Sequence, residues 1–417
     1  MFKHIFNPKT IALIGASNKP KKVGTGIAEN LLKSKKDIYL VNPNRRKLFN
    51  KKSYSSILDI KEDIDLAIIA IPFKFVNKVA EECKAKKVKA MIVISSGFSE
   101  VGNIKEEEAL KSLGIPLVGP NCLGILNTKN NLNASFAPYL PKKGNIALVS
   151  QSGAIIDSII DIAKNENYGF SKIVSLGNEA GIDIADFIEY LGEDKDTDVI
   201  AIYLEGVKNG RKFFNALSKV SKIKPIIILK SGKSELGKSA VLTHTGSLAG
   251  DNKIYSAAFK QAKAIEVKSI EELLDLSKTL SWDKRCKNNV GIITNGGGFG
   301  VLATDFLEKE NIKTLKPIDL MGDALARKYE QALEDLLKRK NIYCVYVLQG
   351  PQIMTEPEKT AKVIVKLKKK YQKPIIVSFI GGDFFKSAIH IIEKNKIPNF
   401  REIKRAVNVI KYLIYEK

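Results

Sequence analysis

The stretch GNIALVSQSGAIIDSIIDIA, at residues 144–163, decides the fold of its part of the chain. Its first half is an apolar run that ends at Ser150, as in a buried strand, and its second half places isoleucines at helical spacing. A turn of small residues, SQSGA at residues 150–154, joins the two halves. Strand, tight turn and helix in this order predict one unit of a doubly wound α/β sheet with parallel strands.

A segment of the same kind, NNVGIITNGGGFGVLATDFLE, occupies residues 288–308. Each segment is followed by a carboxylate-rich helical stretch, a strand, a helix and a strand that begins KPII, at residues 224–227 and 373–376. The repeat is about 140 residues long, which suits a duplicated flavodoxin-like domain and is too long for a solenoid.

Apolar runs also alternate with amphipathic stretches through residues 1–125. This alternation predicts a Rossmann-like sheet, which binds ligands beyond the carboxyl ends of its strands. Those ends are rich in turn-forming residues: Gly15, Ala16 and Ser17; Asn42 and Pro43; Ile71 and Pro72; Ser95, Ser96 and Gly97; Gly119, Pro120 and Asn121. We expect three domains, at residues 1–127, 143–284 and, in shortened form, 288–417.

The composition is that of a globular protein, with 44% hydrophobic residues in 417. No run approaches the ~20 apolar residues of a membrane span, and no signal-peptide core is present, so we expect a cytoplasmic protein without a membrane partner. The four cysteines lack paired spacing, which argues against disulfides and against a zinc site: Cys83, Cys122, Cys286 and Cys344. We expect no metal site in the chain.

The net charge of +23 raises the question of nucleic-acid binding. The lysines are spread along helical stretches such as VIVKLKKKYQK and are not gathered with aromatic residues, so solvated helix faces explain them better. We therefore expect no nucleic-acid partner, whereas a polyanionic small ligand such as CoA or a nucleotide would benefit from the positive field.

His244, in THTGSLAGD at residues 243–251, is one of three histidines in the chain. An imidazole among small and hydroxyl side chains can reach a reacting phosphorus, although a histidine on a loop is also a common surface residue. The two copies of the repeat differ here, because the first has YLEGV with Glu205 where the second has VLQGP with Gln349, and only the first carries this loop. A scaffold would need no such difference, so we predict that His244 and Glu205 are catalytic.

The turn at residues 150–154 opens a helix, where free backbone N–H groups and the helix dipole favour an anion. We predict phosphate binding there by Gln151, Ser152, Gly153 and Ala154, while a purely structural turn stays open as the alternative.

GKSELGKS at residues 232–239 matches the P-loop pattern, but too few residues precede His244 for the phosphate-facing helix. GASNKPKKVG at residues 15–24 departs from G-x-G-x-x-G, which disfavours an NAD-dependent oxidoreductase, and its lysines, with Arg45 and Arg46 nearby, suit a pyrophosphate.

Taken together, these residues resemble the α subunit of the ADP-forming acyl-CoA synthetases (acetate–CoA ligase, ADP-forming), which are related to the succinyl-CoA synthetase α subunit. The segments that carry the resemblance follow the family's order along nearly the whole chain: GAS…KKVG…NLL, VNP, IP, SSGFSE, GPNCLG, GNIALVSQSGA, SLGNEAGID, YLEGVKNGRKF, LKSGKSELG, THTGSLAGD, TNGGGFGVLATD and PIDLMGDA.

The resemblance implies that the N-terminal domain binds CoA at the strand ends, through Gly15, Ala16, Ser17, Lys22, Val41, Asn42, Pro43, Ile71, Pro72, Ser95, Ser96, Gly97, Asn121 and Cys122. It implies that phosphate on the turn at residues 150–154 attacks the thioester, and that His244 takes the phosphoryl group from the resulting acyl phosphate with Glu205 as its acidic partner. CoA or acyl-CoA and phosphate are then the substrates of this chain. ADP or ATP and Mg²⁺ would bind mainly to a separate ATP-grasp β subunit, in an α₂β₂ assembly.

The third domain departs from the family's pattern. ENIKTL at residues 310–315 runs directly into KPIDLMGDA, where the family has a further helix and loop, and Phe299 replaces a small residue or proline. Both differences bear on subunit contacts more than on the chemistry. Two alternatives remain, a CoA-binding regulatory or assembly subunit without turnover and a succinate–CoA ligase α subunit.

Overall fold

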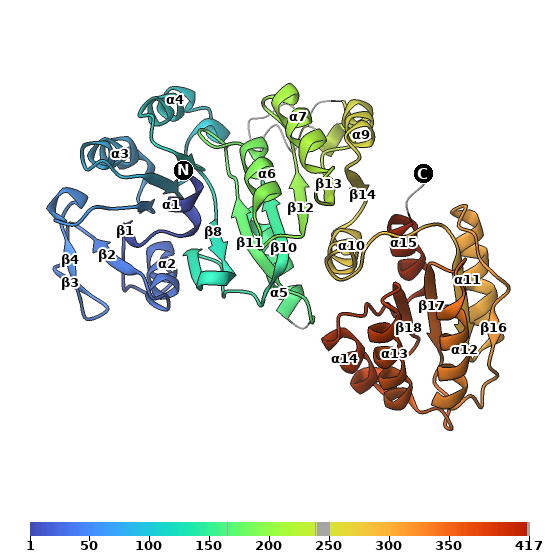
Figure 1. Ribbon diagram of the computed structural model, residues 1–417. Coiled ribbons are helices and arrows are strands. Elements are labelled where there is room, and N and C mark those ends of the chain that lie inside the picture. Colours follow the sequence, from blue (N-terminus) through green and yellow to red (C-terminus); the bar gives the residue numbers. More distant parts are fainter. Residues whose placement is uncertain (165, 238, 240–250, 415–417) are drawn as a thin grey trace. The chain divides into compact units, whose positions relative to one another are not determined.

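The computed structural model describes residues 1–164, 166–237, 239 and 251–414. The chain divides into two compact units, Met1–Lys268 and Ser269–Lys417. Mainly parallel sheets flanked by helices make up both units, which confirms the predicted α/β fold (Figure 1). None of the helices within these residues combines the length and the apolar character that crossing a membrane requires.

The first sheet of the Met1–Lys268 unit has the strand order β3-β4-β2-β1-β5-β6-β7. Its strands are β1 (Thr10–Ile14), β2 (Asp37–Val41), β3 (Lys47–Leu48), β4 (Lys51–Tyr54), β5 (Leu66–Ile69), β6 (Ala90–Val93) and β7 (Leu117–Val118). Apolar residues of α2 (Val23–Leu32) pack on one face, and those of α3 (Val76–Ala85) and α4 (Ile104–Ser112) on the other. Because helices cover both faces of the sheet, strands such as β5 and β6 are wholly buried. Their unbroken apolar runs predict this burial.

The second sheet has the order β14-β13-β12-β10-β11-β8-β9. Its strands are β8 (Gly124–Asn127), β9 (Leu132–Ser135), β10 (Lys143–Ser150), β11 (Phe170–Ser175), β12 (Val199–Leu204), β13 (Ile226–Lys230) and β14 (Ile265–Val267). The associated helices are α5 (Gly153–Lys164), α6 (Ile184–Glu193), α7 (Gly210–Val220) and α9 (Asn252–Gln261), and α1 (Phe2–Phe6) precedes β1. In α5 the buried residues Ile156, Ile159, Ile160 and Ala163 fall at helical spacing, so the opening stretch folds as predicted.

The polar stretch at residues 127–144 is not the plain connection that its composition suggests. Strand β9 lies within it and forms an antiparallel hairpin with β8, and β8 adds to the second sheet beside β11. Some of its polar side chains find partners in the fold, since Asn127 Nδ2 donates to Phe6 O (2.9 Å) and Ser135 Oγ to Asn133 Oδ1 (2.6 Å). Asn30 of α2 also donates to Ser135 O (3.1 Å), so this hairpin joins the first two sheets around a shared core.

The unit Ser269–Lys417 is built on a sheet of order β16-β15-β17-β18, with β15 (Val290–Thr294), β16 (Ile318–Asp319), β17 (Cys344–Gln349) and β18 (Ile375–Phe379). Its helices are α10 (Ile270–Trp282), α11 (Gly297–Lys309), α12 (Ala326–Lys338), α13 (Pro357–Tyr371), α14 (Lys386–Lys394) and α15 (Ile403–Leu413). Asp275 of α10 pairs with Arg405 of α15 at 2.8 Å. The three predicted domain limits stay a prediction.

The strand registers correct our alignment of the two repeats by one residue. Ser150 pairs with Tyr203 in the first copy, and Thr294 pairs with Leu348 in the second. Gln349 therefore matches Leu204, and the counterpart of Glu205 is Gly350. The hydrogen bonds differ between the copies, since Gln151 Oε1 accepts from both Glu205 N and Gly206 N, whereas Asn295 Oδ1 accepts from Gly350 N (2.8 Å). The difference between the copies is thus larger than expected, a carboxylate in one and no side chain in the other.

Candidate active site

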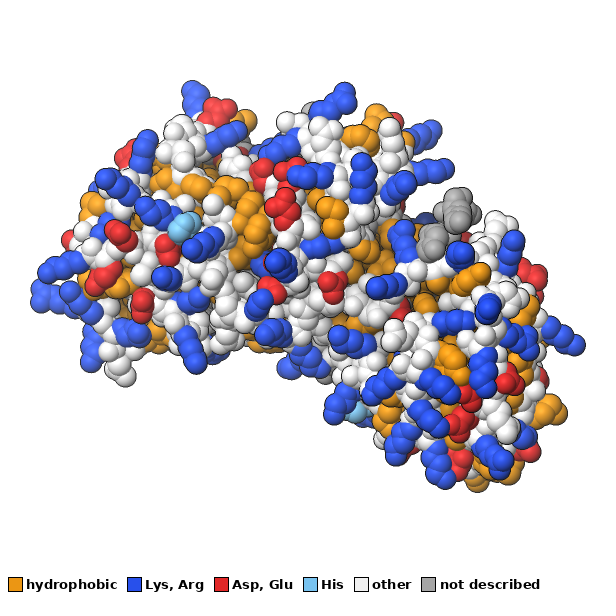
Figure 2. Space-filling model, in the orientation of Figure 1, with side chains coloured by type: hydrophobic (Ala, Val, Ile, Leu, Met, Phe, Trp, Pro, Cys, Tyr) orange, Lys and Arg blue, Asp and Glu red, His pale blue; other side chains and the backbone are white. Residues whose placement is uncertain are grey.

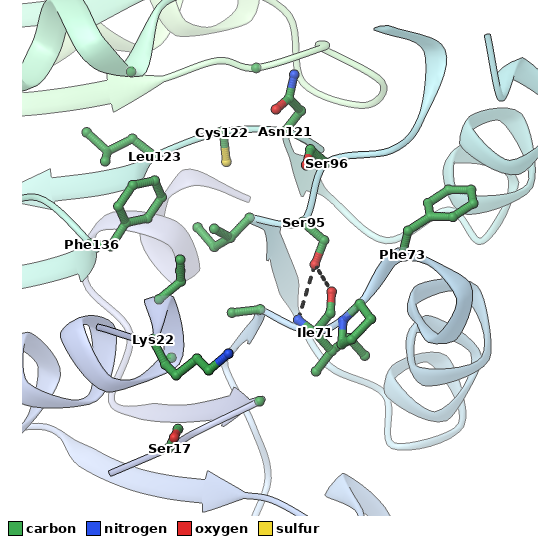
Figure 3. A pocket seen from close by; sticks show the side chains of 18 of the residues that line it. Ser17, Lys22, Ile71, Phe73, Ser95, Ser96, Asn121, Cys122, Leu123 and Phe136 are labelled. Atoms are coloured by element: carbon green, nitrogen blue, oxygen red, sulfur yellow. Dashed lines mark hydrogen bonds between the residues drawn. The ribbon is translucent and has the colours of Figure 1, made fainter. Parts of the chain in front are cut away.

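A pocket of about 1140 Å³ opens at the carboxyl edge of the first sheet (Figure 3). Most residues that the sequence assigns to CoA line it, and so does the whole turn assigned to phosphate: Gly15, Ser17, Lys22, Asn42, Ile71, Pro72, Ser95, Ser96, Asn121 and Cys122, with Gln151, Ser152, Gly153 and Ala154. The structure therefore brings the two predicted sites into one continuous space within the Met1–Lys268 unit.

Four residues assigned to CoA do not line the pocket: Ala16, Val41, Pro43 and Gly97. Ala16 and Val41 are buried beneath its floor, where the backbone N–H groups of Gly15 and Ala16 donate to Val41 O. Pro43 is exposed. Each is adjacent in sequence to a lining residue, so the predicted strand ends lie at the pocket, and the assignment of these residues to CoA stays a prediction.

The turn after β1 requires glycine at two points. Gly15 has φ +95°, and a Cβ there would lie 2.1 Å from Ala70 O. A Cβ at Gly24 would lie 2.0 Å from Gly15 O, so the start of α2 rests directly on this turn. Lys22 precedes α2 with no side-chain cap, which leaves the first N–H groups of the helix available to an anion.

The pocket also contains residues that the sequence reading did not assign to CoA. Lys19 and Arg45 belong to the basic segments already noted and add cations to the lining. Phe73, Leu123, Phe136 and Asn178 had no signal of their own, because Phe136 follows the concealed strand β9 and Asn178 lies in a loop after β11. Only the folded hairpin, through Phe136 N donating to Leu123 O (3.4 Å), places an apolar pair beside the turn. Figure 3 shows Leu123 and Phe136 side by side.

The turn between β10 and α5 is closed by its own serine. Ser150 Oγ accepts from Ser152 N (3.0 Å) and donates to Ser152 O (2.8 Å). Gly153 opens the helix, and a Cβ there would lie 3.3 Å from Leu123 Cβ, which leaves room only for a very small residue. The N-terminal end of α5 therefore faces the pocket with close backbone access, as an anion site requires.

Gln151 ties this turn to Glu205, which follows β12. Its Oε1 accepts from the backbone N–H groups of Glu205 and Gly206, and its Nε2 donates to Gly206 O (2.8 Å) and to the Glu179 carboxyl group. The Gln151 side chain is thus fully engaged by protein, and its backbone N–H donates to Tyr203 O (3.3 Å), so this residue supports the turn and offers no free donor to a phosphate. Glu205 is 5% exposed.

Glu179 is a buried carboxyl group that sequence reasoning missed. It accepts from Ile184 N at the start of α6 (2.8 Å) and from Gln151, and burial raises its pKa to about 7. Its backbone has φ +53°, a conformation that a non-glycine residue rarely adopts. Its segment SLGNEAGID carries part of the family resemblance, but the segment has the composition of an ordinary loop and suggested no role for Glu179.

His244 falls among residues 240–250, outside the described residues. The pairing of His244 with Glu205 therefore stays a prediction, as does the role of GKSELGKS, whose Lys238 is also outside them. All four cysteines are free and buried. Among the described residues, no group of three or more His, Cys, Asp or Glu side chains could hold a metal ion.

Comparison with known families finds matches along both parts of the chain that contribute to this pocket. Residues 9–128 match the family of CoA binding domains, and residues 143–280 match the succinyl-CoA ligase like flavodoxin domain. An acetate–CoA ligase (ADP-forming) of Methanocaldococcus jannaschii is 43% identical over 99% of this chain. The chain spans only 62% of that protein's length.

Subunit α of acetate–CoA ligase (ADP-forming) I of Pyrococcus furiosus is 39% identical, over 98% of this chain and 96% of its own length. Among solved structures, dinucleotide forming acetyl-coenzyme A synthetase 1 of Ca. Korarchaeum cryptofilum, in complex with phosphate and ADP, superposes with a TM-score of 0.93 at 36% identity, covering 99% of this chain and 96% of that one. This chain covers more than two thirds of the P. furiosus subunit at 39% identity. The chain therefore belongs to the family of ADP-forming acetate–CoA ligases.

Proposed function

We propose that the chain is the catalytic α subunit of an ADP-forming acyl-CoA synthetase, which interconverts acyl-CoA, ADP and phosphate with the free acid, ATP and CoA. The observation that carries the proposal is the continuity of the pocket. It joins the strand ends assigned to CoA with the turn at residues 151–154, and Gln151 links that turn to Glu205. A bound phosphate could therefore meet the thioester carbonyl of an acyl-CoA in the same space.

The proposed chemistry has two steps on this chain. A phosphate oxygen, held at the start of α5, attacks the thioester carbonyl carbon, the C–S bond breaks, and CoA leaves as its thiolate. A ring nitrogen of His244 then attacks the phosphorus of the acyl phosphate, and the P–O bond to the acyl group breaks to release the free acid. The Glu205 carboxylate would accept a hydrogen bond from the other ring nitrogen and stabilise the imidazolium that forms.

The phosphoryl group would then pass to ADP on a partner. We propose a separate ATP-grasp β subunit that binds ADP or ATP with Mg²⁺, in an α₂β₂ assembly. The match to a relative named as an α subunit supports a separate partner. The proposed cations of the CoA site, Lys19, Lys22 and Arg45, line the pocket, where they could contact the phosphates of CoA.

A single-turnover experiment tests this proposal. The full chain is mixed with acetyl-CoA, phosphate and Mg²⁺, and free CoA is quantified by chromatography. We expect CoA release that depends on phosphate and approaches one equivalent per chain. A regulatory CoA-binding subunit would bind acetyl-CoA without cleaving it, and that result would contradict the proposal. Faster release from succinyl-CoA than from acetyl-CoA would instead favour a succinate–CoA ligase α subunit.

A further inference from the structure

We propose that Lys230 is a positioning residue for the phosphoryl-transfer step, an inference that rests on the proposed function. Lys230 is the last residue of β13 and is 2% exposed. Its Nζ donates to Glu205 O (2.8 Å) and to Ser231 O, and it lies 4.8 Å from the centre of the Tyr255 ring. One ammonium group thus contacts Glu205, the adjacent residue Ser231 and the ring of Tyr255.

Those three contacts involve Glu205 itself and residues on either side of the segment that carries His244 in the sequence. Glu205 carries the catalytic carboxylate, Ser231 begins the chain that leads from β13 toward residue 244, and Tyr255 belongs to α9, which follows that segment. Gln151 already holds Glu205 through its backbone N–H. Lys230 holds the carbonyl of the same residue, so the main chain of Glu205 is fixed from the phosphate turn on one side and from β13 on the other.

The second copy of the repeat shows that the fold itself does not need this lysine. Leu204 pairs with Lys230 in the first copy, and the equivalent Gln349 pairs with Phe379 in the second. Phe379 is buried and stacks on Phe385 at 5.1 Å, as an ordinary core residue does. Burying an ammonium group costs free energy that a phenyl ring does not. The charge is therefore kept only in the copy that carries Glu205.

Lys230 can act on the reaction through Glu205 in two ways. Its hydrogen bond to the Glu205 carbonyl limits rotation of the turn, so the carboxylate is held in one direction. Its ammonium group and the Glu205 carboxylate attract each other, so a positive charge is kept beside the carboxylate that would stabilise an imidazolium. Both effects concern phosphoryl transfer, and neither concerns acyl-CoA binding, because Lys230 does not line the pocket.

The test measures the rate of phosphoryl gain, by intact mass, in the full-length chain supplied with phosphate, Mg²⁺ and varied acetyl-CoA. In Lys230→Met we expect the maximal rate to fall by about tenfold or more, with half-saturation by acetyl-CoA unchanged. The matched control is Lys172→Met. Lys172 lies in β11, is also 2% exposed, and forms an ion pair with Asp194 at 2.6 Å. We expect that control to lower stability but to keep the rate.

The outcomes separate the two proposals. A wild-type chain that gains no phosphoryl group would overturn the proposed function and this inference with it. A wild-type chain that reacts, beside a folded Lys230→Met variant that reacts equally fast, would overturn this inference alone. If Lys230→Met does not fold, Lys230→Gln takes its place, because its shorter and neutral side chain removes both the positive charge and the bond to Glu205 O. A maximal rate in Lys230→Gln equal to that of the wild type would also overturn the inference.

Discussion

Glu205 is held in place through its main chain, so its position does not depend on the charge of its side chain. Gln151 and Lys230 bind its N–H and its carbonyl, so neither contact depends on the carboxylate. We therefore expect Glu205→Gln to fold normally while its phosphoryl gain slows by about 100-fold, since the neutral amide stabilises an imidazolium poorly. Denaturant unfolding and time-resolved intact mass check the two halves of this prediction. An unchanged rate would remove Glu205 from the mechanism.

Glu179 predicts a pH dependence of stability. Burial raises its pKa from 4.5 to about 7, so between these values the folded chain holds a proton that the unfolded chain has released. The contribution of Glu179 is complete below pH 4.5 and is lost as pH rises through about 7. We expect the free energy of unfolding of Glu179→Gln, measured by denaturant titration, to fall less steeply than that of the wild type over this range. Parallel curves would contradict the assignment.

At the scale of elements, helix α2 depends on one close contact with the β1 turn. A Cβ at Gly24 would lie 2.0 Å from Gly15 O, a backbone atom that cannot move freely, whereas a Cβ at Gly26 would meet only Phe136 Cβ at 3.9 Å. We expect Gly24→Ala to lower the free energy of unfolding by about 2 kcal/mol or more and to weaken CoA binding. Gly26→Ala, on the same helix, is the control and should do neither. Equal effects of the two substitutions would show that this contact is not what seats the helix.

The sequence predicted the elements that have strong apolar periodicity, and it missed those stabilised by polar pairing. Strands β1, β5, β6 and β10 and helix α5 lie where their patterns place them. The pattern did not reveal strand β9, because its sequence LNAS is half polar and yet wholly buried, with Ser135 Oγ donating to Asn133 Oδ1. The one-residue misalignment of Glu205 arose because similar side chains were matched, whereas the sheet register is set by backbone pairing.

The same limit applies to the site. Turns at strand ends are visible in sequence, since small and turn-forming residues gather there, and most of the predicted residues line the pocket. Phe136 and Asn178 reach it from elements that pack against the first sheet only after folding. Glu179 became visible only through its burial and its bond to Gln151. Tertiary contacts bring these three residues to the site, and no local sequence pattern records such contacts.

At the scale of the whole molecule, the positive charge is dispersed. Figure 2 shows Lys and Arg side chains scattered over the face in view, without a single basic patch. This distribution fits a general attraction for anionic ligands better than a dedicated nucleic-acid groove. The absence of a nucleic-acid partner stays a prediction.

The proposed binding of the nucleotide by a separate β subunit gives a further prediction for the whole molecule. The chain alone, given acetyl-CoA, phosphate, ADP and Mg²⁺, should stop after one phosphoryl group per chain and make no ATP. Adding an ATP-grasp β subunit should discharge the phosphoryl group and give steady ATP formation, which a luciferase assay follows. Sustained ATP formation by the chain alone would show that the nucleotide site lies on this chain and would contradict a separate β subunit.

The central claim is that His244 carries phosphorus between the acyl phosphate and the nucleotide. The most direct measurement is fragmentation mass spectrometry, under neutral conditions, of the chain after reaction with acetyl-CoA, phosphate and Mg²⁺. We predict an acid-labile phosphoryl group located on His244 and absent from His244→Ala. A phosphoryl group located on another residue, or one that persists in His244→Ala, would contradict the account.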